Sequence, residues 1–335
     1  MTARIGVRVL ETSVRVRAND AALLPRFPLR VEVPSLLTDF HDPRAADAPA
    51  AADGEIILED RPKGPLTFVL RGTTARFAGP LVRAESEASD PRYTLWGNQG
   101  FLYRFILRLL EEKHAIFSFH AAGLYDEAAD TLYVIAGGAG RGKTVYLLSG
   151  LDRGLKLFST ETVHVRLGRR GAVWFKGSLV DNVRLGTLAV DFPRFAPAGI
   201  AAVREDDLWR QKTALDLSAR QTARDRLAAP RVVLIFPHIE EGRPGHVLAS
   251  VVRRESAAKA VFDNIAQKIG ETVVLDDALA IPGLDSAALA AARWALALRL
   301  VRSASVIRIA SVLSNPRECW GGLLDVRRNE RRRLS

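Results

Sequence analysis

The chain has 335 residues, 48% of them hydrophobic and 26% charged, a composition typical of a globular protein with one large domain and an appendage or with two domains. No apolar stretch approaches the roughly 20 residues of a membrane span, and the N-terminus alternates Arg with Val instead of forming the apolar block of a signal peptide. The single cysteine, Cys319, excludes an intramolecular disulfide and a cysteine-based metal cluster. We therefore expect a cytoplasmic protein with no membrane partner, in which Cys319 is a core residue.

The net charge of +10 favours anionic partners in general. The arginines are scattered, however, and concentrate only in RRNERRRLS at residues 327–335. We interpret this tail as a solvated terminus and not as a nucleic-acid site.

Residues 1–95 contain short alternating runs separated by Pro, Gly and Asp. The runs lie at residues 7–10, 14–16, 29–33, 55–58 and 67–70. Such runs are typical of half-buried strands, so we predict a small, mostly-β N-terminal domain.

From residue 97 to 113 the pattern becomes helical, with apolar side chains repeating at the spacing of a buried helix face. We place the domain boundary near residue 95, which gives a second domain at residues 96–335. After this helix, the apolar runs at 115–123 and 131–136, joined by DEAAD, predict two strands connected by a hairpin turn.

A glycine-rich motif follows the second of these strands and precedes the helical segment 145–151. Its residues fit GxxxxGK[ST] in full: Gly137, Gly138, Ala139, Gly140, Arg141, Gly142, Lys143 and Thr144. Glycines let successive backbone N–H groups converge on phosphate oxygens, and the start of the following helix adds a favourable dipole. Lys143 would reach the β- and γ-phosphates and the Thr144 hydroxyl would bind Mg²⁺, so we predict a nucleotide loop in preference to an accidental Gly-rich turn.

The next acidic candidate lies in LKLFSTETV, a short strand that ends in polar residues. Glu161 is the only carboxylate there, and at a strand end it can hold Mg²⁺ or accept a proton from a hydroxyl. Taken alone, such a Glu is more often a surface residue. His164 and Asp181 are weaker candidates nearby in the sequence.

These landmarks resemble the HPr kinase/phosphorylase group, whose P-loop domain is related to phosphoenolpyruvate carboxykinase. The similar segments are His120-Ala121-Ala122, the glycine-rich motif, Arg153-Gly154, LFSTE, NVRLGTL at 182–188 and DLWRQK at 207–212. They span about residues 100–240 and are most similar to the HPr-kinase-related kinases of the B-type subgroup. The resemblance implies an α/β fold: a P-loop kinase domain of HPr kinase/phosphoenolpyruvate carboxykinase type with a small mostly-β N-terminal domain.

The resemblance also implies ATP-dependent, Mg²⁺-requiring phosphorylation of a hydroxyl on a protein or small molecule. Its catalytic candidates here are Glu161, His120, Lys143 and Arg184, with Thr144 and Glu161 as metal ligands. Read without the resemblance, His120 would be a core histidine and Arg184 an exposed side chain. Whether the chain assembles into homo-oligomers, as HPr kinases do, and which acceptor it takes stay open.

One position departs from the resemblance. Family members carry a pair of acids where this chain has Thr160-Glu161, and Thr160 cannot ionise. A second class of function therefore stays in play, a nucleotide-binding regulatory module with weak or no kinase activity. For that class, Thr160→Asp is expected to raise phosphate transfer.

A competing acidic site lies at TVVLDD, residues 272–277, an apolar run that ends in Asp276 and Asp277. If this run lay beside the strand that precedes the glycine-rich motif, it would be a Walker B strand and the chain a P-loop ATPase. We favour the kinase, because the His-Ala-Ala and Arg-Gly landmarks flank the motif in the expected order.

The remaining segments have structural patterns. PRVVLIFP at 230–237 predicts a strand at the centre of a sheet, and residues 257–268 and 286–301 predict helices. Residues 301–312 either extend the last helix or turn away from it.

Overall fold

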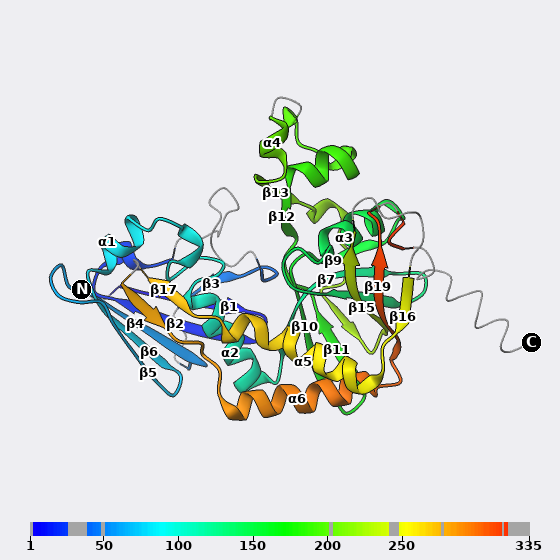
Figure 1. The fold of residues 1–335 in the computed structure, drawn as a ribbon. Coiled ribbons are helices and arrows are strands. Elements are labelled where there is room, and N and C mark those ends of the chain that lie inside the picture. The colour runs from blue at the N-terminus through cyan, green and yellow to red at the C-terminus, as the bar shows by residue number, and fades with distance from the viewer. Residues whose placement is uncertain are drawn as a thin grey trace, which may run out of the picture. The chain divides into compact units, whose positions relative to one another are not determined.

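The computed structural model describes residues 3–25, 39–47, 51–200, 204–240, 248–275, 278–316 and 318–320. The chain forms two compact units, Met1–Ser118 with Ile265–Arg293 and Phe119–Asn264 with Trp294–Ser335. Each unit combines helices with a mixed β-sheet (Figure 1). Among the described residues, no helix is both long enough and apolar enough to cross a membrane.

The first unit is built on a six-stranded sheet with the order β3-β1-β2-β4-β6-β5. Its strands are β1 (Ala3–Val9), β2 (Thr12–Ala18), β3 (Arg44–Ala46), β4 (Gly54–Asp60), β5 (Thr67–Arg71) and β6 (Thr74–Gly79). Burial alternates along β2, where Val14 and Val16 are buried and Arg17 is exposed. The predicted run at 29–33 lies outside the described residues.

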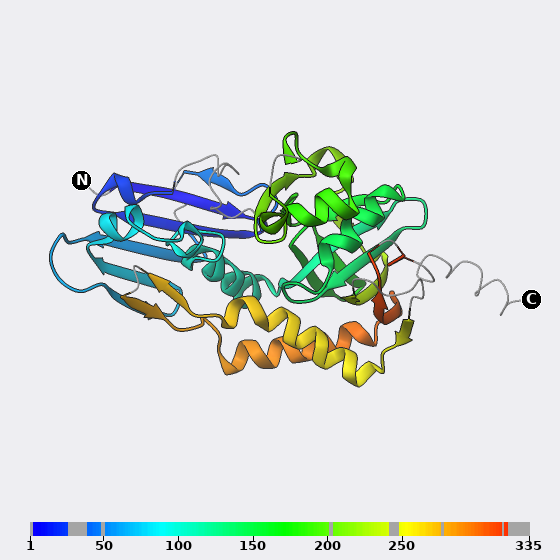
Figure 2. The same cartoon turned by 45° about the horizontal axis from the view of Figure 1, so that its top comes forward.

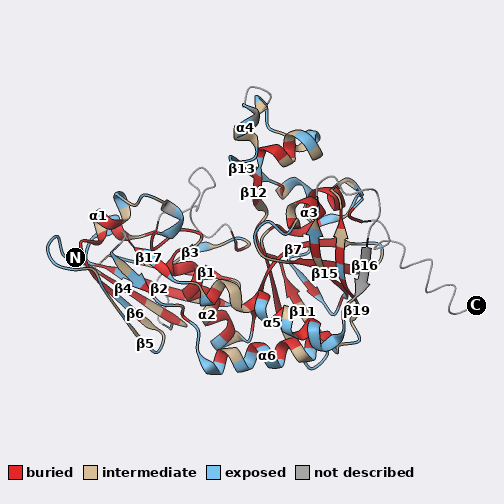
Figure 3. Ribbon diagram, viewed as in Figure 1, coloured by how far each residue is buried: buried red, intermediate tan, exposed pale blue. Residues whose placement is uncertain are grey.

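Helix α2 (Phe101–His114) packs against this sheet with its apolar face buried (Figure 3). A Cβ atom at Gly54 in β4 would lie 2.6 Å from the Leu109 side chain and 2.8 Å from that of Phe105, so only glycine lets the helix approach this closely. Because α2 covers this sheet, it belongs to the first unit, whereas the sequence placed it after a boundary near residue 95. The division into independently folding domains stays a prediction.

The first unit also contains α1 (Leu81–Ser86) and two short strands, β17 (Val273–Leu275) and β18 (Leu279–Ile281). These two strands form their own antiparallel sheet. The strand of the proposed Walker B site is therefore not a neighbour of β8 (Thr131–Ala136), which pairs with β7 (Phe117–Asp126) and β15 (Arg231–Ile239). Asp276 and Asp277 lie outside the described residues.

The second unit is built on a nine-stranded sheet with the order β14-β11-β10-β7-β8-β15-β19-β16, and β9 pairs with β7 beside this path. The further strands are β9 (Lys156–Ser159), β10 (Thr162–Gly168), β11 (Gly171–Phe175), β14 (Arg226–Ala228), β16 (Leu248–Val251) and β19 (Val306–Ser314). β8, β15 and β19 are mutually parallel and β7 runs antiparallel to β8. All six residues of β8 are buried, as expected of a central strand.

The described residues of the second unit also include α3 (Lys143–Asp152), α4 (Glu205–Leu208) and the antiparallel strands β12 (Val180–Arg184) and β13 (Lys212–Asp216). Two longer helices, α5 (Arg254–Gly270) and α6 (Ala287–Val301), belong partly to this unit. Helices α5 and α6 run alongside each other (Figures 1 and 2), and each contributes residues to both units. The predicted hairpin, the strand at 230–237 and the helices at 257–268 and 286–301 are all present.

Helix α3 is held against the sheet by the segment near the end of the described chain. The Trp320 indole N–H donates to the Tyr146 carbonyl over 2.9 Å, and its ring packs edge-on against Tyr133. Cys319 is fully buried here, which confirms its prediction as a core residue. The start of α3 is thereby fixed relative to the end of β8.

Candidate nucleotide-binding site

The glycine-rich loop, residues 137–142, connects the end of β8 to the start of α3. Gly140 has φ 76° and Gly142 has φ 95°, conformations that L-residues rarely adopt. A Cβ atom at Gly142 would also collide with the Ile239 side chain at the end of β15. The two glycines are therefore needed for the loop to turn between β8 and α3 beside β15.

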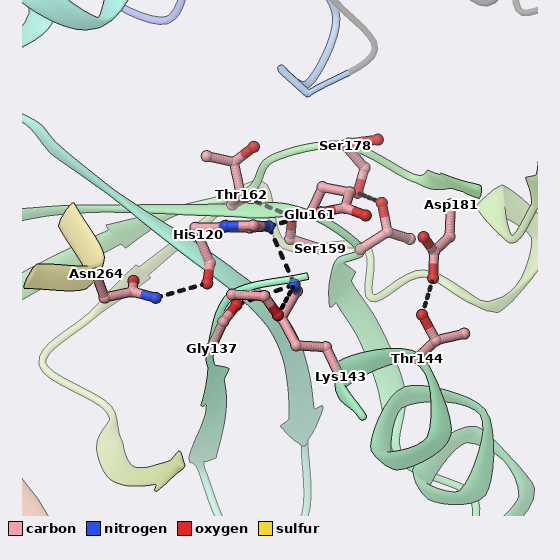
Figure 4. Close-up of polar contacts among 12 residues, drawn as sticks. His120, Gly137, Lys143, Thr144, Ser159, Glu161, Thr162, Ser178, Asp181 and Asn264 are labelled. Carbon is pink, nitrogen blue, oxygen red and sulfur yellow. Dashed lines mark hydrogen bonds and ion pairs between the residues drawn. The ribbon is translucent and has the colours of Figure 1, made fainter. Parts of the chain in front are cut away.

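Lys143, the first residue of α3, directs its ammonium back into this loop (Figure 4). Its Nζ lies 3.0 Å from the Gly137 carbonyl oxygen and 3.3 Å from that of Gly138. It also lies 3.0 Å from Nε2 of His120. The side chain is buried, and the two carbonyl oxygens and the imidazole nitrogen are hydrogen-bond partners for its ammonium in place of water.

His120 lies on β7, next to the strand that leads into the loop. Its carbonyl oxygen accepts from Gly137 N–H over 3.3 Å and from the Asn264 side-chain amide over 3.0 Å. Asn264 is on α5 and buried. Sequence reasoning missed it, because an Asn in a helix that follows the loop by more than a hundred residues carries no local signal.

Glu161 lies between β9 and β10, next to the same ring nitrogen of His120 that Lys143 contacts (Figure 4). Its Oε2 is 3.3 Å from His120 Nε2, and its carbonyl oxygen accepts from Ala121 N–H over 3.0 Å. The side chain remains 28% exposed. The structure therefore brings three of the four catalytic candidates together, namely His120, Lys143 and Glu161.

Asp181, on β12, supplies a second carboxylate at this site. Its Oδ2 accepts from the Thr144 hydroxyl over 2.9 Å, and the side chain is only 2% exposed. Burial raises the pKa of Asp181 well above its ordinary value, and the negative charge of the Glu161 carboxylate raises it further. The sequence offered Asp181 only as a weak candidate, since an acid at a strand start is common on protein surfaces.

The oxygen atoms of Thr144, Glu161 and Asp181 fit a small divalent cation. Once ionised, the Asp181 and Glu161 carboxyl groups would supply negative charge for a cation, and Mg²⁺ prefers oxygen ligands. Mg²⁺ commonly takes one or two protein carboxylates and completes its shell with water and phosphate oxygens. In the described part of the chain, no cluster of three or more His, Cys, Asp or Glu side chains forms a protein-only metal site.

Thr160 occupies the position at which the resemblance predicts an acid. Its hydroxyl does not face the glycine-rich loop but donates to the Val180 carbonyl over 2.7 Å, and it lies 3.2 Å from the Ser178 carbonyl. The side chain is 1% exposed. The position is therefore filled by a hydrogen-bonded core group.

Two arginines of the predicted site have other partners. The Arg184 guanidinium, on β12, is exposed and donates to the Trp209 carbonyl, so its role in phosphate binding stays a prediction. Arg141, in the glycine-rich loop, points to His238 at the end of β15, with Nη1 3.3 Å from Nδ1.

His164 on β10 is fully buried, which lowers its pKa to about 3 and keeps it neutral.

No protein-family model matches the chain, and no curated protein matches it. Among solved structures, the Hpr(Ser) kinase/phosphatase from Coxiella burnetii is similar, with a TM-score of 0.28 and 11% sequence identity over 65% of this chain and 97% of that one. At this level of similarity, the function has to be inferred from the side chains of the site itself.

Proposed function

We propose that the chain is an ATP-dependent, Mg²⁺-requiring kinase that transfers the γ-phosphate to a hydroxyl of a protein or small-molecule acceptor. The observation that supports this most is the set of contacts where β8 leads through the glycine-rich loop into α3. Lys143 and Glu161 both contact His120, and Asp181 contacts Thr144, the residue after Lys143. This set contains a cation for phosphate, oxygen ligands for a metal and an accessible carboxylate.

The phosphates would bind to the glycine-rich loop. Its backbone N–H groups and the start of α3 attract anions, and Gly140 and Gly142 allow the turn that directs these groups inward. The Lys143 ammonium is held at the same loop and has three rotatable donors for the phosphate oxygens. Its positive charge would stabilise the negative charge on the oxygen that leaves with ADP.

The two carboxylates allow the tasks of metal binding and proton transfer to be divided. Asp181 is buried beside the Thr144 hydroxyl, so these two residues would hold Mg²⁺, which leaves Glu161, a predicted metal ligand, available for proton transfer. Mg²⁺ bound there would neutralise phosphate charge during transfer. A single carboxylate need not perform both roles.

Glu161 is the more exposed of the two and would act as the base. Its carboxylate would take the proton of the acceptor hydroxyl as the hydroxyl oxygen forms a bond to the γ-phosphorus and the bond from that phosphorus to the β–γ bridging oxygen breaks. The products are then a phosphate ester, ADP and a protonated Glu161. Nε2 of His120 lies 3.3 Å from this carboxylate and 3.0 Å from the Lys143 ammonium.

The test is transfer of labelled γ-phosphate from ATP, with Mg²⁺, to fractionated protein and metabolite pools. Wild type is expected to label an acceptor. Glu161→Gln should lower transfer by about a hundredfold or more while still binding ATP, and Lys143→Ala should lose ATP binding. Lys156→Ala, which changes an exposed lysine on β9, is the matched control and should behave as wild type.

Two results would contradict the proposal. If wild type bound ATP but labelled nothing in any pool, the chain would be a nucleotide-binding regulatory module. If Lys143→Ala bound ATP as tightly as wild type, the glycine-rich loop would not be the nucleotide site at all.

A further inference from the structure

A cluster of buried hydroxyl groups connects the loop that carries Glu161 to the strand that carries Asp181. Thr160 is joined to the Ser178–Val180 segment twice, by its backbone N–H, which donates to the Ser178 carbonyl over 2.8 Å, and by its hydroxyl, which donates to the Val180 carbonyl over 2.7 Å. Val180 directly precedes Asp181. Thr160 therefore bonds the backbone next to the buried acid.

Ser178 adds a second hydroxyl to the same carbonyl. Its Oγ donates to the Val180 carbonyl over 2.8 Å and accepts from Val180 N–H over 3.2 Å. Thr160 and Ser178 are each 1% exposed, so these bonds do not compete with bulk water. The peptide unit before Asp181 is thus held from two sides.

The segment is also fixed by close packing at Gly177. A Cβ atom there would lie 2.6 Å from the Ser159 hydroxyl and would collide with the Thr162 carbonyl. The backbone of residue 177 therefore sits directly on the turn between β9 and β10. Together, this packing and the hydrogen bonds of Thr160 fix the position of the start of β12 relative to the turn between β9 and β10.

An aspartate at position 160 would not fit this environment as an anion. Its carboxylate would face the carbonyl oxygens of Ser178 and Val180, which are acceptors and offer it no proton. A buried charge without a donor is strongly unfavourable. We therefore expect Thr160→Asp not to raise phosphate transfer, which is the outcome that the sequence associates with a regulatory module.

We infer that Thr160 is a positioning residue: its hydroxyl holds the start of β12 so that Asp181 stays beside Thr144 and Glu161 in the orientation that binds the divalent cation. This inference rests on the proposed function, because it assigns Thr160 a task in the same metal site. Groups that orient metal ligands commonly change metal affinity by 10–100-fold when they are removed.

The variants Thr160→Val and Thr160→Ser distinguish the effect of the Thr160 hydroxyl on metal binding from the effect of the side-chain shape. Valine is nearly isosteric but cannot donate, and serine keeps the donor. The probe is Mn²⁺ with the protein in excess over ATP, with free Mn²⁺ measured by electron paramagnetic resonance against a sample of ATP alone. ATP affinity without metal is measured by calorimetry on the same proteins.

Thr160→Val is expected to weaken Mn²⁺ binding to the ATP-bound protein by about tenfold, with ATP affinity without metal within about twofold of wild type. Thr160→Ser should restore Mn²⁺ affinity to within about twofold, a rescue that depends on the hydroxyl. Ser178→Ala removes the second donor to Val180 and should give a smaller loss in the same direction, which provides a second test if Thr160→Val does not fold.

Equal Mn²⁺ affinity in wild type, Thr160→Val and Ser178→Ala would overturn the role of Thr160 and leave the proposed function intact. Tighter Mn²⁺ binding in Thr160→Asp would also overturn it, because position 160 would then accept an acid. If wild type bound no Mn²⁺ with ATP, both this inference and the proposed function would be overturned.

Discussion

Glu85, on α1, is a carboxyl group whose surroundings favour the protonated form. Burial raises its pKa from 4.5 to about 7, against a hydrogen bond from Leu95 N–H over 2.7 Å that acts in the opposite direction. Between these two pH values the unfolded chain has released the proton and the folded chain still holds it. The contribution of Glu85 to stability is therefore present at low pH and lost as the pH rises through this window.

Glu85→Gln is expected to remove this dependence, because glutamine keeps an acceptor for Leu95 N–H and does not ionise. The free energy of unfolding of wild type should fall between pH 5 and pH 8 by on the order of 2 kcal/mol more than that of the variant. Urea unfolding at three pH values across the window measures both. Parallel pH profiles for the two proteins would show that Glu85 titrates normally.

At the same residue scale, the sequence identified the members of the site that lie in a local motif. Lys143 and Thr144 follow directly from the glycine-rich spacing, and the structure places His120 and Glu161 beside them. Asp181 could not be assigned in this way, because its place beside Thr144 depends on the tertiary position of the separate β12–β13 pair. The hydroxyl direction of Thr160 is likewise a tertiary property.

Helix α3 shows how closely an element must pack to hold the glycine-rich loop. A Cβ atom at Gly150 would collide with the Leu124 side chain on β7 and lie 2.9 Å from the Trp320 ring. A Cβ atom at Gly270, at the end of α5, would meet nothing within 4 Å. The two positions are therefore a matched pair of helical glycines, one crowded and one open.

Gly150→Ala is expected to destabilise the protein by about 1–3 kcal/mol, the usual cost of overpacking a core. Gly270→Ala should leave stability unchanged or raise it slightly, since alanine is the better helix former. Thermal unfolding of the two variants and wild type measures the difference. Equal midpoints for Gly150→Ala and wild type would mean that α3 can move away from β7 without cost.

Elements with a long periodic pattern, or with a short apolar run bounded by turn residues, were predictable, and the run at 301–312 was not. The helices at 257–268 and 286–301 lie within α5 and α6, and the strand at 131–136 matches β8. Residues 301–312 could not be assigned, because a short apolar run fits a helix or a strand equally well. Pairing with β15 and β16 makes Val306–Ser314 the strand β19.

At the scale of the whole molecule, the first unit is assembled from chain segments that are far apart in sequence. Arg293 on α6 is fully buried, with Nε 3.0 Å from Glu111 Oε2 on α2, and it also binds Asp285. Burial raises the pKa of Glu111 to about 8, while the Arg293 charge acts to lower it. The arginine thereby compensates the buried Glu111 carboxyl and also pairs with the more exposed Asp285.

Arg293→Ala is expected to destabilise the protein by about 3–5 kcal/mol, because it leaves Glu111 buried without its partner. Arg299→Ala, which changes an exposed arginine on the same helix, is the control and should stay within about 0.5 kcal/mol of wild type. Chemical unfolding of both variants checks this. Similar losses for the two arginines would show that the buried ion pairs add nothing specific.

The central claim is that Asp181 and Thr144 complete a metal–nucleotide site at the glycine-rich loop. Its most direct test is calorimetric titration of ATP, with and without Mg²⁺, into wild type, Asp181→Asn and the control Asp216→Asn on the paired strand β13. We predict that Mg²⁺ strengthens ATP binding in wild type and Asp216→Asn, and that Asp181→Asn loses about tenfold or more of this gain while binding ATP alone as wild type does. An undiminished Mg²⁺ effect in Asp181→Asn would contradict the account.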